Sequence, residues 1–98
     1  MNKREAIEII ENCLPLLQEN FGVVKIGLFG SAVRDELSEV SDIDIAVELE
    51  EDYKTMKNFL GLNRQLEELF HMKVDLGIES ALKPLARKFI EKEIIYIH

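Results

Sequence analysis

Residues 28–44 read Leu-Phe-Gly-Ser-Ala-Val-Arg-Asp-Glu-Leu-Ser-Glu-Val-Ser-Asp-Ile-Asp, and we expect the chain to be organised around this stretch. Gly30 and Ser31 close one apolar run, and Asp42 and Asp44 open a second one after ten intervening residues. A glycine lets the backbone approach a phosphate closely, and paired carboxylates can bind a divalent cation. The stretch therefore predicts a phosphate site beside a cation site, as a nucleotide-using enzyme requires.

The segments around this stretch alternate apolar and polar side chains, which is the pattern of β-strands with one buried face. We predict strands over residues 23–29, 43–49 and 73–78, while residues 94–97 either add a short edge strand or simply pack down. The aliphatic face is predicted to carry Val24, Ile26, Leu28, Ile43, Ile45, Val47, Leu49, Val74, Leu76 and Ile78. Asp42, Asp44 and Asp75 then share the opposite face, so periodicity alone predicts three carboxylates on one exposed surface.

Apolar residues at helical spacing predict three helices, which run to about residues 21, 70 and 92. Asn2 is suited to cap the first helix, and Pro15 should kink or divide it near Asn12. Asp52 is the expected cap of the second helix. The buried residues of that helix are predicted to be Met56, Phe59, Leu60, Leu66, Leu69 and Phe70.

These elements predict one α/β (α+β) domain over residues 1–98. Its small mixed β-sheet would have helices packed on one face, and the active site would lie on the open face.

The acidic residues are concentrated in one part of the chain. The 98 residues carry a net charge of −7, and residues 35–52 include nine acidic residues but neither Lys nor Arg. Such a block repels a nucleic-acid backbone, which argues against nucleic acid as a partner. No apolar run approaches the roughly 18 residues of a membrane span, and a lone cysteine, Cys13, fits a reducing compartment. We therefore expect a cytoplasmic protein that makes no contact with membranes.

The spacing of the glycine, serine and aspartates is more informative than the residues themselves. A plain interpretation makes the aspartates a strand cap and the Gly-Ser pair an ordinary turn. However, Gly-Ser-x10-Asp-x-Asp should arise by chance in a chain this long with a probability on the order of 10⁻³. Carboxylates so placed can hold two ions about 3.5–4 Å apart, which assists displacement at phosphorus. Mg²⁺ is the expected ion, because it takes a few carboxylates and completes its shell with water and phosphate oxygens.

The motif also resembles that of a known family. Gly30-Ser31, ten residues, Asp42-Ile43-Asp44 and then Val74-Asp75-Leu76 are similar to the signature of the DNA polymerase β nucleotidyltransferase superfamily. At this length the chain resembles the minimal nucleotidyltransferase (MNT) group, whose members are commonly antitoxin partners of HEPN-domain toxins. The resemblance implies Mg²⁺ ligands at Asp42 and Asp44, a third carboxylate at Asp75, and triphosphate contacts at Gly30 and Ser31.

The chain departs from the family pattern at two positions. Many relatives have Arg directly after the Ser, and Gly after the second Arg, where this chain has Ala32 and Asp35. Arg34 is therefore the expected cation for the triphosphate, and Lys25 and Lys73 are further candidates.

The activity that the resemblance implies is transfer of AMP from Mg·ATP to a hydroxyl, with tyrosine as the expected acceptor, of a HEPN toxin. Larger relatives add a domain that holds the acceptor, and 98 residues leave no room for one, so a partner is expected to deliver it. The chain is expected to associate with that partner or with itself. Two alternatives stay open: an antitoxin acting by complex formation with weak or no catalysis, and a free-standing nucleotidyltransferase acting on RNA or a small molecule.

Overall fold

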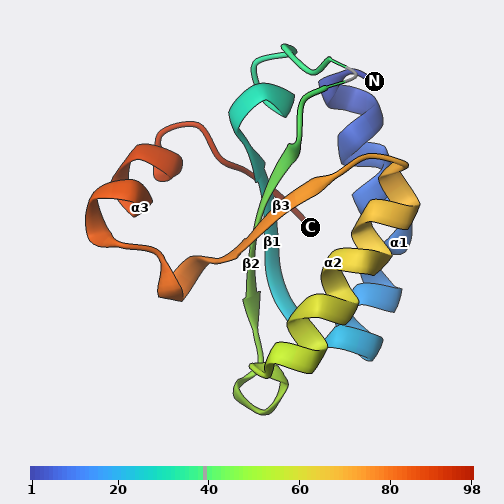
Figure 1. Ribbon diagram of the computed structural model, residues 1–98, viewed down its shortest axis with the longest axis vertical. Coiled ribbons are helices and arrows are strands. Elements are labelled where there is room, and N and C mark those ends of the chain that lie inside the picture. Colours follow the sequence, from blue (N-terminus) through green and yellow to red (C-terminus); the bar gives the residue numbers. More distant parts are fainter. Residues whose placement is uncertain (39) are drawn as a thin grey trace.

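A four-stranded sheet lies at the centre of the computed structural model, which describes residues 1–38 and 40–98 (Figure 1). The strand order is β3-β2-β1-β4, with β2 parallel to β3 and the other neighbours antiparallel. The strands are β1 (Val23–Phe29), β2 (Ile43–Leu49), β3 (Val74–Ile78) and β4 (Ile95–Ile97). The predicted mixed sheet is confirmed, and of the two alternatives for residues 94–97 the structure shows the short edge strand.

Helices α1 (Lys3–Phe21) and α2 (Met56–Phe70) pack side by side on one face of this sheet (Figure 1). As predicted, the Asn2 side chain caps α1 by accepting the Glu5 amide at 2.9 Å. The predicted division of α1 at Pro15 is wrong, because the helix is continuous through that residue. Proline removes one backbone hydrogen bond, but Ile10 and Leu17, on either side of it, are both fully buried and hold the two halves against the core.

The start of α2 differs from the prediction and changes which of its residues are buried. A 3₁₀ turn occupies Glu51–Tyr53, and Thr55 rather than Asp52 caps the helix by accepting the Asn58 amide at 3.1 Å. The buried residues of α2 follow every fourth position and are Leu62, Leu66 and Phe70. Met56 and Leu60, both predicted to be buried, are exposed because they lie off this stripe.

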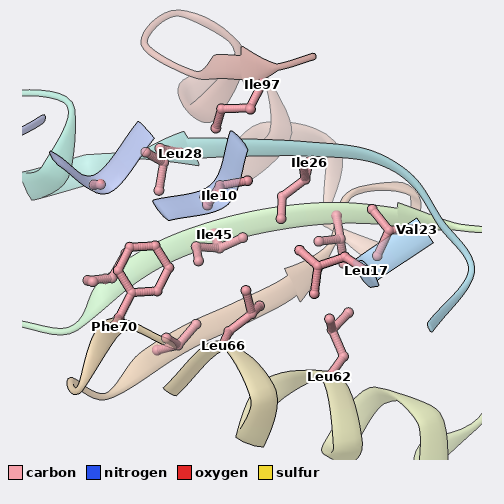
Figure 2. Packing of buried hydrophobic residues seen from close by; sticks show 14 of the residues in the cluster. Ile10, Leu17, Val23, Ile26, Leu28, Ile45, Leu62, Leu66, Phe70 and Ile97 are labelled. Carbon is pink, nitrogen blue, oxygen red and sulfur yellow. The ribbon is translucent and has the colours of Figure 1, made fainter. Parts of the chain in front are cut away.

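The hydrophobic core lies between these two helices and the sheet. Figure 2 shows Ile10 and Leu17 of α1 and Leu66 of α2 facing Ile26 and Ile45 of the sheet. All five side chains are at most 1% exposed. Close packing of this kind holds the strands in a fixed register, so the core determines which side chains meet on the other face.

One strand residue faces the opposite way from the prediction. Val24 was expected to share the buried face with Ile26, but it is 61% exposed and Val23 is buried instead. The pairing of β1 with β2 has an irregularity between Val23 and Lys25, which changes the alternation at that point.

The third helix, α3 (Pro84–Glu91), lies on the other side of the sheet (Figure 1). A side chain at Gly27 of β1 would meet Ile94, and one at Gly77 of β3 would come close to Leu82. The segments that flank α3 therefore cover part of the face that was predicted to be open. None of the helices in the described part of the chain has both the length and the apolar character needed to cross a membrane.

Candidate active site

Asp44 and Asp75 meet on the sheet face opposite to the core. Asp44 lies in β2 and Asp75 in β3, and the parallel register makes them direct partners. Strand neighbours are about 4.8 Å apart, so two partnered side chains on one face are in contact range. Asp42 precedes β2 by one residue and is exposed. Of the three carboxylates that strand periodicity predicts on one face, the pairing of Asp44 with Asp75 is confirmed, and the place of Asp42 beside them stays a prediction.

The charge of Asp44 is unfavourable in this arrangement. The pKa of Asp44 is raised from its ordinary value of 3.8 to about 6, chiefly by burial and also by the charge of Asp75, a hydrogen bond with Asp75 and the charge of Asp42. Arg34 lowers that pKa in part. The site therefore concentrates negative charge that a bound cation would neutralise.

Gly30 begins the 3₁₀ turn Gly30–Ala32 directly after β1 and lies against Asp44. Its φ of 69° is in the left-handed region, which side chains rarely adopt. A Cβ atom at this position would overlap Oδ2 of Asp44. Only glycine therefore satisfies both the backbone conformation and the space at this position.

Arg34 and Glu93 complete this end of the site, and Glu93 was not predicted. Oε1 of Glu93 accepts the Gly30 amide at 2.9 Å, and Oε2 accepts from Nη1 of Arg34 at 2.8 Å. Arg34 also pairs through Nε with Glu36 at 3.3 Å. A lone glutamate before a short strand carries no sequence signal for this role. Only the pairing of β4 with β1 brings it to the turn.

The two departures from the family pattern have structural explanations. Ala32 is completely buried, so the turn packs on a small side chain at the position where many relatives have a cation. Asp35 has a φ of 56°, a conformation that explains a glycine in relatives and that aspartate tolerates better than most residues. Its Oδ1 accepts the Lys3 amide at 2.6 Å, which ties the segment after the turn to the start of α1.

The two lysines proposed as extra cations have different surroundings. Lys25 pairs with Glu79 at 3.5 Å and lies 4.3 Å from the ring centroid of Tyr96. Its ammonium is therefore engaged by Glu79 and Tyr96, and a role for Lys25 at the triphosphate stays a prediction. Lys73 lines a surface hollow together with Asp42, so it remains a candidate.

The donor set fits a hard divalent cation, although the side chains do not form a closed cage. Within residues 1–38 and 40–98, no three His, Cys, Asp or Glu side chains converge as a preassembled metal site. Mg²⁺ needs only one or two carboxylates and takes its other ligands from water and substrate phosphates. The acidic pair and Asp42 meet that requirement, so Mg²⁺ binding by Asp42, Asp44 and Asp75 stays a prediction.

Comparison with known proteins identifies the family. A family model described as a nucleotidyltransferase domain matches residues 10–97. The chain belongs to the nucleotidyltransferase family. The predicted enzyme class and the resemblance to minimal nucleotidyltransferases are thereby confirmed, and Asp44, Asp75 and Gly30 lie together in a nucleotidyltransferase fold.

Individual relatives agree with this assignment. The chain is 44% identical over 81 residues to the protein adenylyltransferase MntA of Thermococcus cleftensis, covering 83% of this nucleotidyltransferase and 81% of the relative. A solved structure, provisionally described as a minimal nucleotidyltransferase, superposes with a TM-score of 0.83 at 33% identity and covers 97% and 95% of the two chains. A crystal structure of a toxin–antitoxin with AMP-PNP shares the fold, with a TM-score of 0.71 at 23% identity, and covers 98% of this chain and 72% of that one.

Proposed function

We propose that this nucleotidyltransferase is an antitoxin that transfers AMP from Mg·ATP to a tyrosine hydroxyl on a HEPN-domain toxin. The observation that carries the proposal is the Asp44–Asp75 pair, which faces away from the core beside a glycine turn and Arg34. The names of the adenylyltransferase relative and of the toxin–antitoxin structure support the choice of reaction and partner. The lone Cys13 and the need for ATP fit action in the cytoplasm.

Each residue of the site is assigned a separate role in the reaction. Ser31 and Arg34 would hold the triphosphate, and Asp75 would accept the proton of the attacking hydroxyl. The hydroxyl oxygen bonds to the α-phosphorus of ATP, the bond from that phosphorus to the bridging oxygen breaks, and pyrophosphate leaves. When bound by Asp42 and Asp44, Mg²⁺ would neutralise charge on the phosphates.

The pKa of Asp44 also supports this chemistry. Because Asp44 is partly buried and lies near Asp75 and Asp42, its negative charge is costly without a cation. Carboxyl groups whose pKa values are shifted by burial and by like charges cluster at functional sites. The site is therefore built to bind a cation together with an anionic substrate.

The decisive experiment is label transfer from radiolabelled ATP to the protein encoded next to this one, in the presence of Mg²⁺. We expect label on the partner, and loss of label with Asp42→Asn combined with Asp44→Asn. The matched control is Glu48→Gln, which removes a carboxylate from the same face of β2 outside the site. Equal labelling by the double variant would contradict catalysis.

The same assay separates the alternatives. Neutralisation of the partner by an aspartate variant, through a stable complex, would favour an antitoxin that acts without catalysis. Label on RNA instead of protein would favour a free-standing nucleotidyltransferase.

A further inference from the structure

Glu93 joins the two groups that lie nearest to the predicted triphosphate site. One oxygen accepts the Gly30 amide at 2.9 Å, and the other accepts from Arg34 at 2.8 Å. We propose that Glu93 is a positioning residue that holds the glycine turn and Arg34 ready for the triphosphate without touching it. This inference rests on the proposed function, because it assigns Arg34 to the nucleotide.

Arg34 can be held by Glu93 and still bind a phosphate. A guanidinium has five N–H donors in a rigid planar fork. In the structure Nη1 contacts Glu93 and Nε contacts Glu36. These contacts leave Nη2 for a ligand, and the Arg34 side chain is 46% exposed. The two carboxylates thus hold the guanidinium in one orientation without using all of its donors.

Glu93 is itself held in place by the segment between α3 and β4. Its backbone amide donates to the Ile90 carbonyl at 3.0 Å, and the next residue, Ile94, packs on Gly27. The side chain is only 25% exposed. If it left, the partly buried Gly30 amide would lose its acceptor, which is costly for a backbone donor. These contacts favour a fixed clamp, in which Glu93 stays bound to the Gly30 amide and to Arg34. They argue against a glutamate that leaves this position when a triphosphate binds.

The clamp changes the role expected for Gly30. Because its amide is engaged by Glu93, that N–H is not available to a phosphate. Gly30 then serves the site through its positive φ and its missing side chain next to Asp44. Ser31, with a backbone amide and a hydroxyl at the same turn, becomes the main contact from this segment.

The experiment compares Mg·ATP binding to the isolated protein by calorimetry for wild type, Glu93→Gln and Glu93→Ala. We expect both variants to bind about tenfold more weakly, the scale of losing one charge-assisted hydrogen bond. The matched control is Glu91→Gln, which removes the same charge two residues away, where Glu91 pairs with Arg87 on the surface of α3. That variant should bind within about twofold of wild type.

Two further measurements test whether Glu93 acts through Arg34. Glu93→Ala should weaken binding much less in an Arg34→Ala background than in wild type, because the group it positions is absent. In the transfer reaction, Glu93→Gln should raise the KM for ATP about tenfold and leave the KM for the acceptor protein unchanged. A general loss of structure would change both KM values and would lower the melting temperature.

Several outcomes would overturn the proposal. If Glu93→Gln bound Mg·ATP as tightly as wild type, the contacts of Glu93 would serve the fold and not the nucleotide. If Glu93→Gln bound Mg·ATP more tightly than wild type, Glu93 would be a competitor of the triphosphate. Failure of wild type to bind Mg·ATP would refute the proposed function and this role with it. The Gly30 amide proton, followed by NMR, tests the contact itself independently of the proposed function, because its resonance should move upfield in Glu93→Ala whether or not nucleotide binds.

Discussion

Asp44 and Glu48 lie on the same face of β2, about 13 Å apart along the strand, yet their surroundings are opposite. Burial raises the pKa of Glu48, but hydrogen bonds from Ser80 and Lys54 outweigh this and leave its pKa below the usual value. Those partners approach its oxygens within 3.2 Å. Asp44 instead faces Asp75, and its pKa rises to about 6.

The difference shows how one strand can serve stability at one end and chemistry at the other. The charge of Glu48 is satisfied by partners within the chain, so it holds the segment after β3 against β2. The charge of Asp44 is left for a ligand to satisfy. Carboxylates whose charge is compensated internally contribute to folding, and uncompensated ones mark a site.

The largest expected effect is on catalysis. Asp44→Asn should lower the initial rate of label transfer by about 10²–10³-fold, the scale of losing one group that stabilises charge in a transition state. Glu48→Gln should stay within about threefold, because its partners are structural. Similar losses in both variants would remove the functional distinction between the two ends of the strand.

The next effect concerns the glycine beside Asp44. Gly30→Ala should lower the free energy of unfolding by about 1–3 kcal/mol, because alanine strains a positive φ and its Cβ overlaps the carboxylate. Urea denaturation measures this, with Gly61→Ala as the control. Gly61 lies within α2, and the nearest atom to a Cβ there is 3.4 Å away, so alanine should stabilise the helix by about 0.5–1 kcal/mol.

A smaller effect is the pH dependence of stability without metal. The folded-state pKa of Asp44, about 6, lies above its ordinary value of 3.8, so this group should add stability as pH falls from about 7 to about 4. Asp44→Asn should therefore raise the free energy of unfolding at pH 7.5 by about 1 kcal/mol, discounted for partial solvent exposure. This gain should vanish near pH 4, where the wild-type group is protonated.

Glu48→Gln should have the opposite sign in the same urea titrations. Its lowered pKa means that it stabilises the fold above its unfolded-state pKa and loses that contribution on acidification. The substitution should cost less than about 1 kcal/mol at neutral pH, and the cost should shrink in acid. If the effects of Asp44→Asn and Glu48→Gln on the free energy of unfolding changed with pH in the same direction, the contrast between the two carboxylates would be contradicted.

The smallest effect tests the irregular pairing at the Glu48 end. Val24→Thr should change the free energy of unfolding by no more than about 0.5 kcal/mol, because Val24 is 61% exposed. Val23→Thr should cost clearly more, since Val23 is 4% exposed and belongs to the core. Chemical denaturation of both variants checks this, and a larger cost for Val24→Thr than for Val23→Thr would instead fit the regular alternation that the sequence predicts.

The sequence by itself determined the strands and the principal acidic pair. Alternation of branched apolar residues with aspartates is a local property of a pleated strand, so it predicted β2 to the residue and placed Asp44 and Asp75 on one face. The spacing of Gly30 from Asp42 indicated the family because β1 and β2 follow one another in the chain and pair directly, so the motif lies within one continuous segment.

Only the tertiary structure decided the contacts between distant segments. The clamp of Glu93 on Gly30 spans 63 residues, and it exists because β4 pairs with β1 at the far edge of the sheet. The exposure of Val24 depends on how β1 registers against β2, and the buried stripe of α2 depends on where Thr55 caps it. Such features arise from packing between elements, which local periodicity does not encode.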